Sequence, residues 1–384
     1  LVLLITMLQN KIYQNFIKEI LKTFFVILFG LSIIAWTVRA VNFLDLIVEN
    51  GYSVLLYFQY SFLNLFGVLT KFIPLSFLIA LIIFIVKQIQ ENEFVILWTS
   101  GVKKIKIVNL FFVISLLVLF VYLTFSTFIT PMALNKSRNL LSKDGYNSIV
   151  PTIRVQQFSD SFKGFTFLVE NRVNNEIKNV FIHDKSDVLK NLTSNSSVKK
   201  TTTIIAKEGI VEEKRMILFD GNIITSNKGN SKSDLIKFTQ LNIDLANLQT
   251  STIKVPKLQE TSTLDLLRCI FVSPDETILN CKKNTEQEIT TVLNRRIILP
   301  FYVPIVALLC SFLLIKNPSR KNFFLNKYSI FLISFLILLY AELIIRYTGI
   351  SKIIGGLFIF SPFIMMPIIY LILIYKFSKE SIYK

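Results

Sequence analysis

Six apolar runs of membrane-spanning length fall into two groups of three, and a long polar stretch separates the groups. A helix needs about 20 mostly apolar residues to cross the hydrocarbon core of a bilayer. The pattern therefore predicts a polytopic α-helical membrane protein with six transmembrane helices and one inserted water-facing domain. The predicted spans are Phe24–Val41, Phe62–Val86, Val108–Ile129, Ile297–Ile315, Ser329–Ile345 and Ile354–Ile374.

The run that contains the second span is longer than one straight crossing requires, and Pro74 lies inside it. We expect an interfacial or tilted helix from about Tyr52, followed by a kinked crossing. No small-residue cleavage site follows the first span, which favours a membrane anchor over a cleaved signal peptide. The natural start is expected at Leu1 or Met7.

The excess of basic residues belongs to the membrane halves. Residues 131–294 hold 22 of the 42 Lys and Arg and 18 of the 25 Asp and Glu, which leaves 20 basic and 7 acidic residues elsewhere. This distribution argues against a nucleic-acid-binding domain. Basic groups flank the spans at Lys11, Lys18, Lys22, Lys87, Lys103, Lys104, Lys106, Lys316, Arg320, Lys321, Lys327, Lys376, Lys379 and Lys384. Short cationic loops stay cytoplasmic, so both termini are predicted in the cytoplasm and the polar domain in the periplasm of a bacterium.

Strand-like segments recur between turn residues in the polar stretch. They are Phe165–Glu170, Asn179–His183, Thr201–Ala206, Met216–Phe219 and Leu235–Ile243, with turns predicted at Asn174–Asn175, Asp220–Gly221 and Lys228–Gly229–Asn230. This spacing predicts an antiparallel β-jellyroll or sandwich. Its interior is either an ordinary filled core or a groove that holds acyl chains, and the pattern does not separate the two.

These elements predict four regions along the chain. Spans one to three occupy residues 1–130, with a cytoplasmic helix at about 90–101, and the β-jellyroll domain occupies 131–260. A periplasmic connector at 261–296 then leads to spans four to six at 297–384.

The side chains of common catalytic and metal sites are missing. The chain has no Gly-x-x-x-x-Gly-Lys-Ser/Thr loop for ATP, no Gly-x-Ser-x-Gly and no His-Glu-x-x-His. One histidine, His183, does not make a metal site. We therefore expect a non-catalytic chain without a cofactor or metal of its own.

Three cysteines are present. Cys310 lies in the fourth span, where we expect plain packing. Cys269 and Cys281 flank a short loop on the predicted periplasmic side, where the oxidising environment permits a disulfide. The alternative is two unpaired small apolar residues.

The loop after the second span reads as a short amphipathic helix. Phe94, Leu97, Trp98 and Gly101 share one stripe at helical spacing. Glu91 and Glu93 stand near the helix start, where they favour the helix dipole, and Gly101 can end the helix. The stripe either docks into the groove of a soluble partner or lies on lipid headgroups.

Charged residues also lie near the outer ends of the spans. They are Arg39, Lys71, Arg295, Arg296 and Arg346, with Glu342 one turn before Arg346. Charges at this depth are costly and often functional, so together they can bind an anionic lipid headgroup. The alternative is snorkelling side chains and a simple Glu342–Arg346 pair on one helix.

Several segments resemble the LptF/LptG permeases of the lipopolysaccharide export system, in order and over nearly the whole chain. They are Leu69–Ser76, Glu91–Gly101, Ile205–Gly209, Leu218–Gly221, Leu293–Pro300 and Asn317–Arg320. The segments Leu293–Pro300 and Asn317–Arg320 are more similar to LptF than to LptG. The low glycine content and the two outer cysteines, Cys269 and Cys281, depart from the family pattern.

The resemblance implies an ATP-binding-cassette permease subunit in the bacterial inner membrane. LptF and LptG form a heterodimer on two copies of the ATPase LptB, which binds the ATP. They extract lipopolysaccharide and pass it through the β-jellyroll to LptC, LptA and the outer membrane. The family implies ATPase docking through Glu91, Glu93, Phe94, Leu97, Trp98 and Gly101, and headgroup binding by Arg39, Lys71, Arg296 and Arg346. Alternatives are a membrane-anchored periplasmic ligand-binding or sensory module, or a permease for another lipid.

Overall fold

The computed structural model describes residues 11–48, 53–145, 155–162, 165–173, 175–185, 200–211, 215–227, 233–244, 257–271, 286–315 and 327–382. Its contacts divide the chain into two compact units. The first, called the membrane unit, comprises Leu1–Val38, Asn64–Leu134 and Lys257–Lys384. The second, called the β-unit, comprises Arg39–Leu63 and Asn135–Pro256.

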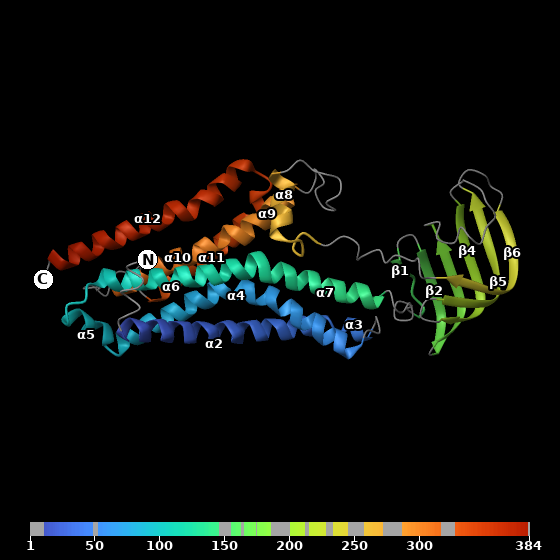
Figure 1. Ribbon diagram of the computed structural model, residues 1–384, viewed down its shortest axis with the longest axis horizontal. Coiled ribbons are helices and arrows are strands. Elements are labelled where there is room, and N and C mark those ends of the chain that lie inside the picture. The colour runs from blue at the N-terminus through green and yellow to red at the C-terminus, as the bar shows by residue number, and fades with distance from the viewer. Residues whose placement is uncertain are drawn as a thin grey trace. The chain divides into compact units, whose positions relative to one another are not determined.

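Within the described residues, six helical stretches are long and apolar enough to cross a membrane, as predicted. Their elements are α2 (Lys11–Asn42), α4 (Val54–Gln90), α6 (Lys104–Thr124) with η1 (Phe125–Ile129) and α7 (Thr130–Gly145), α9 (Glu286–Ile297) with η5 (Leu299–Phe301), α10 (Tyr302–Cys310) and η6 (Ser311–Leu314), α11 (Lys327–Thr348), and α12 (Lys352–Ile382) (Figure 1). Short helices α3 (Asp45–Val48), α5 (Glu93–Thr99) and α8 (Thr263–Phe271) lie between them. The fold is therefore that of a polytopic helical membrane protein with an inserted β-domain.

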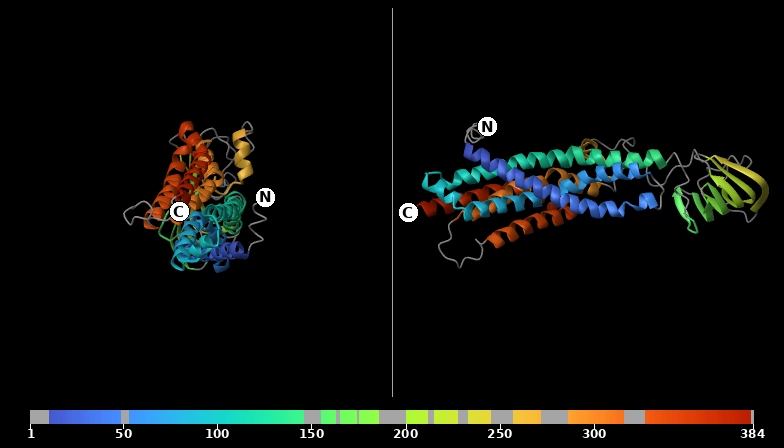
Figure 2. Two further views of the ribbon diagram at one scale, coloured as in Figure 1. Left: turned by 90° about the vertical axis from the view of Figure 1, so that its left-hand side faces the viewer. Right: turned by 90° about the horizontal axis from the view of Figure 1, so that it is seen from below.

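Three of the spans form the interior of the membrane unit. In the most apolar windows of the spans that contain α4, α6 and α10, 61, 50 and 67 % of residues are buried within the chain. For α2, α11 and α12 the shares are 17, 28 and 22 %. In the end-on view of Figure 2 the blue-to-teal helices gather beside the orange-to-red ones. The outer three helices thus keep apolar surface for lipid or for another protein.

The helix α4 continues through Pro74, which lies inside it as expected for a long crossing. Near this proline, the Thr70 hydroxyl donates to the carbonyl of Phe66 at 2.9 Å. The same hydroxyl lies 2.7 Å from the hydroxyl of Thr130. The expected start of this helix at Tyr52 lies outside the described residues.

The β-unit contains one antiparallel sheet whose strands pair in chain order. The strands are β1 (Ser159–Phe162), β2 (Phe165–Val173), β3 (Glu176–Asp184), β4 (Lys200–Val211), β5 (Arg215–Asn227) and β6 (Ser233–Asp244). All predicted strand segments lie in these strands, which confirms the antiparallel β-domain. Among the described strands the pairing is that of a meander, because each strand bonds to its sequence neighbour, and the crossed strand order of a jellyroll is not seen.

A crease runs across this sheet. Asn179 of β3 and Asp220 of β5 have left-handed φ angles of 50° and 47°. The strand registers place Lys207 of β4 opposite both of them. On β5 the buried positions switch from Leu218 to Ile223, so the strand exchanges its inward face at Asp220. Strands that kink at aligned positions bend a sheet toward itself. One meander can therefore close a core by itself.

The expected turn at Asp220–Gly221 is wrong, because both residues lie inside β5 at the crease. A turn and a strand kink can both contain left-handed backbone, so the Asp–Gly pair correctly indicated a left-handed residue but not the type of element. Gly221 is required by close packing. A Cβ there would lie 2.4 Å from the carbonyl oxygen of Ile205 and 2.5 Å from the ring of Phe238.

The described interior of the β-domain is filled by its own side chains. Val169, Ile182, Ile204 and Leu218 are all fully buried, in one cluster with the residues around them. This conformation therefore has an ordinary core, and an acyl chain would have to displace these side chains. His183 is half-buried, and its Nδ1 forms a hydrogen bond of 2.9 Å with the hydroxyl of Thr203.

Candidate functional site

The helix α5 is fixed to the membrane unit by the stripe that the sequence analysis singled out. Phe94 and Leu97 are buried, with 1 % and 9 % of their surfaces exposed. The ring of Phe94 stacks on Trp98 and meets the rings of Phe16 and Phe84 edge-on, with centroids 6.0 to 6.4 Å apart. The apolar stripe therefore anchors the helix to its own protein. It is not available as a face for a soluble partner.

The opposite face of α5 is the one that a partner can reach. Glu93, Val95, Ile96 and Thr99 of α5 are exposed, and 64 % of the Ile96 surface is open. Glu91, which lies just before the helix, is also exposed, so this surface combines two carboxylates with two apolar side chains. Sequence reasoning missed Val95 and Ile96, because periodicity shows that a stripe exists but not whether it turns toward the protein or away from it.

Trp98 and Gly101 complete the end of this helix. The ammonium group of Lys104 lies 4.5 Å from the centroid of the Trp98 ring, a cation–π contact. Gly101 has a φ angle of 89° and directs the chain out of the helix, as predicted for a helix-ending glycine. The amide of Val102 then bonds to the carbonyl of Leu97 at 3.0 Å. Both residues hold the helix in place.

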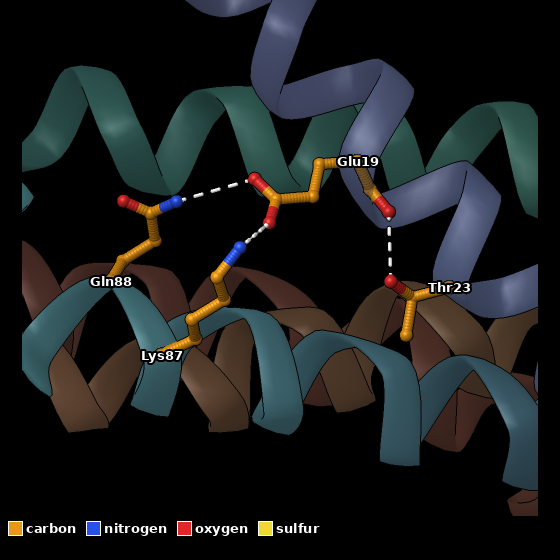
Figure 3. Close-up of polar contacts among 4 residues, drawn as sticks. All are labelled: Glu19, Thr23, Lys87 and Gln88. Atoms are coloured by element: carbon orange, nitrogen blue, oxygen red, sulfur yellow. Dashed lines mark hydrogen bonds and ion pairs between the residues drawn. The ribbon is translucent and has the colours of Figure 1, made fainter. Parts of the chain in front are cut away.

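A polar cluster joins α2 to α4 close to α5 (Figure 3). Lys87 donates to Glu19 Oε1 at 2.5 Å, and the Gln88 side-chain amide donates to Glu19 Oε2 at 3.3 Å. Both partners of Glu19 precede α5 by a few residues. Sequence reasoning missed this carboxylate, although Glu19 is the sole acidic residue before Asp45 and stands between lysines.

The basic residues near the outer ends of the spans fall into two kinds. Arg39, Lys71 and Arg346 have exposed side chains on α2, α4 and α11. These are the positions from which a side chain can reach a headgroup. Arg39 belongs to the β-unit, and Lys71 and Arg346 to the membrane unit.

Glu342 pairs across two helices and not along one. Its Oε1 lies 2.6 Å from Nη2 of Arg295 on α9. The expected pair of Glu342 with Arg346 is replaced by this contact. The two helices also approach closely near Gly349, just after α11, where there is no room for a Cβ beside the carbonyl of Gln287 on α9.

Arg296 points into the protein, with only 6 % of its surface exposed. Its guanidinium donates to the carbonyls of Leu258, Gln259 and Thr261 at 3.3, 2.9 and 3.0 Å, and to Thr263 Oγ1 at 2.9 Å. These four acceptors take up the guanidinium N–H groups that a lipid phosphate would need as donors. We therefore leave Arg296 out of the headgroup-binding set.

The cysteines and the metal question add little to the site. Cys310 is buried in α10 and unpaired, as expected for packing. Cys269 lies in α8 and is disulfide-bonded, while Cys281 lies outside the described residues, so its identity as the partner stays a prediction. Within the described ranges, no group of three or more His, Cys, Asp or Glu side chains is placed to hold a metal ion.

A comparison with protein families decides what these features belong to. The family model of the lipopolysaccharide export system permease LptF/LptG matches residues 15–376. The chain belongs to the LptF/LptG family. The match covers both membrane halves and the inserted β-domain together, and it does not distinguish LptF from LptG. A comparison with curated proteins finds no match.

Membership in the LptF/LptG family makes this chain a multi-pass membrane protein and a lipopolysaccharide export permease, a transport subunit and not an enzyme. The fold explains two of the segments that resembled the family. Ile205–Gly209 and Leu218–Gly221 lie side by side on β4 and β5, where Ala206 pairs with Gly221 and Gly209 with Leu218. Both segments therefore build the crease of the β-domain.

Proposed function

We propose that this chain is the permease subunit of an ATP-binding-cassette transporter that extracts lipopolysaccharide from the bacterial inner membrane. It pairs with a second permease of the LptF/LptG family and works on a dimer of an LptB-type ATPase. The β-domain faces the periplasm and hands the lipid to LptC and LptA. The observation that carries the proposal is the family match over residues 15–376.

The geometry of α5 supports a docking role at the ATPase. A seven-residue helix has little stability of its own, so its position depends on side chains that hold it. Phe94 and Leu97 supply this anchor, while Glu93 and Ile96 face outward. A soluble partner can therefore grip the outward face and move α5 together with the spans to which it is fixed.

Movement of α5 has a direct route to the first span. Phe16 of α2 contacts Phe94, and Glu19 of α2 binds Lys87 and Gln88 just before α5. Beyond this end, α2 packs through one narrow stripe that includes Phe24 and Leu28. A helix held firmly at one end and loosely along its length is suited to open a path for a lipid.

The exposed basic side chains are our candidates for contact with the lipid. Arg39, Lys71 and Arg346 carry the positive charge that phosphates on a lipid headgroup attract. Arg39 is the basic residue in the last turn of α2. We place it first in this role, because the family resemblance gives the first span a basic position of this kind.

The experiment purifies the chain with its partner permease and ATPase and identifies the bound lipids by mass spectrometry. We expect lipopolysaccharide to be enriched over bulk phospholipid, and ATP to release it. Enrichment of a different lipid favours a permease of other specificity. A chain that purifies and functions without any ATPase favours a ligand-binding or sensory module, and either result rejects the proposal.

A further inference from the structure

A buried polar network joins three separate segments of the membrane unit. The Arg296 guanidinium donates to Thr263 Oγ1, and the Thr263 hydroxyl donates in turn to the carbonyl of Thr127 at 2.6 Å. The Ser126 hydroxyl donates to the backbone carbonyl of Arg296 at 2.7 Å, which closes the ring. We call Ser126, Thr127, Thr263 and Arg296 the latch.

The latch sits where the third span departs from α-helical geometry. Ser126 and Thr127 belong to η1, a π-helical turn between α6 and α7. Such turns are rare within α-helices and are frequent at functional sites, because they leave backbone groups open to other partners. Here the Thr127 carbonyl has such a partner in Thr263.

The latch residues also lie where the chain leaves the membrane unit toward the inserted domain and where it returns from that domain. The chain leaves the third span through η1 and α7 on its way to the β-strands. It returns at Lys257 and passes through the residues that Arg296 binds, Leu258 to Thr263. Arg296 itself lies in the last turn of α9, at the start of the fourth span.

The hydrogen bonds of the latch require an arginine at position 296. The guanidinium presents five donors in a planar fork, whereas lysine presents one compact ammonium group. Four acceptors spread over residues 258–263 match the fork. The adjacent Arg295 has a different task, because it reaches Glu342 on α11 and remains 37 % exposed.

We infer that Arg296 is the positioning residue of a latch that ties both chain connections of the inserted domain to spans three and four. Through it, rearrangement of the spans is passed to the inserted domain in each transport cycle. The inference rests on the proposed function. It goes further in naming the residues through which the membrane unit controls the domain.

The test measures lipopolysaccharide released per ATP hydrolysed by the full complex in proteoliposomes. The variants are Arg296→Lys, which keeps the charge, and Thr263→Val, which keeps the shape but removes the hydroxyl. We expect ATP hydrolysis to stay near the parent value and release per ATP to fall about two- to thirtyfold, the range for altered coupling between distant sites. The double variant should be no worse than Arg296→Lys, since both changes open the same latch.

Arg295→Lys is the matched control, because it changes the neighbouring arginine and leaves the latch intact. The inference is overturned if release per ATP is unchanged in both variants, or if Arg295→Lys lowers it equally. It is also overturned if ATP hydrolysis and release fall together, as loss of folded protein would cause. A parent complex that releases no lipopolysaccharide contradicts the proposed function itself.

Discussion

Phe94 of α5 meets Phe16 of α2 edge-on, with ring centroids 6.2 Å apart and planes at 89°. The contact joins the helix that faces the expected ATPase to the first membrane span. The contact shows that the apolar stripe of α5 packs inward, whereas the amphipathic pattern alone was also compatible with a stripe that binds a partner. In the proposed function, the inward residues would transmit movement and the outward residues would meet the ATPase.

Substitution of the two faces of α5 should therefore give different defects. Phe94→Ala should destabilise the membrane unit by about 3–5 kcal/mol, the cost of removing a buried phenylalanine. Ile96→Ala should change stability by less than about 0.5 kcal/mol, as for most exposed side chains, yet weaken ATPase binding. Thermal unfolding and co-purification of the ATPase check both effects. Equal losses of stability in the two variants would refute the assignment of faces.

The Glu19–Lys87 pair offers a test by charge exchange. Glu19→Lys places like charges together and should lower both thermal stability and ATP-driven release. Exchange of the partners, Glu19→Lys with Lys87→Glu, should restore much of the loss because the pair is re-formed. Lys87 is about half exposed, so the effect on stability alone should be modest. Failure of the double exchange to rescue release would show that the pair does not act as a unit.

The crease of the β-domain predicts opposite behaviour at adjacent positions. Gly221→Ala should destabilise the domain by about 1–3 kcal/mol, the usual cost of overpacking, since the added Cβ meets Ile205 and Phe238. Asp220→Asn should be close to neutral, because asparagine also accepts left-handed backbone. Denaturation of the two variants measures the difference. A tolerated Gly221→Ala would contradict the close packing.

Lipid contact by Arg39 can be tested with crosslinking. Arg39→Glu should reduce site-specific crosslinking of the first span to lipopolysaccharide, because it replaces a phosphate-attracting charge with a repelling one. Lys22→Glu, on the same helix just before the opposite end of the predicted span Phe24–Val41, should leave crosslinking unchanged. Unchanged crosslinking in Arg39→Glu would reject the role.

The predicted bridge between Cys269 and Cys281 is checked by thiol labelling of the denatured protein with and without reductant. We expect two of the three thiols to label only after reduction, and Cys310 to label in both conditions. Labelling of all three without reductant would show that no bridge exists.

The spans, the strands and the family segments could be predicted because each is local. Apolar length identifies a span, and short apolar segments between turns identify strands. The direction in which a side chain points is not local. Phe94 faces inward, where it meets Phe16 of α2 and Phe84 of α4, and neither of these residues belongs to α5.

The same limit explains the arginines at the fourth span. Arg295 and Arg296 are adjacent and chemically identical, and depth alone suggested one role for both. Helical geometry turns them about 100° apart, so one reaches Glu342 and the other the connector. Glu342 likewise pairs with Arg295 on another helix and not with Arg346 on its own helix. Such choices depend on helix packing, which no motif encodes.

The most direct test of the account follows lipopolysaccharide in proteoliposomes that contain this chain, its partner permease and the ATPase. Transfer to an acceptor outside the vesicles is measured with and without ATP, for the parent and for Glu93→Lys on the outward face of α5. We expect ATP-dependent transfer by the parent, and loss of transfer and of ATPase docking in the variant. Transfer that needs no ATP, or that survives in Glu93→Lys with normal docking, would contradict it.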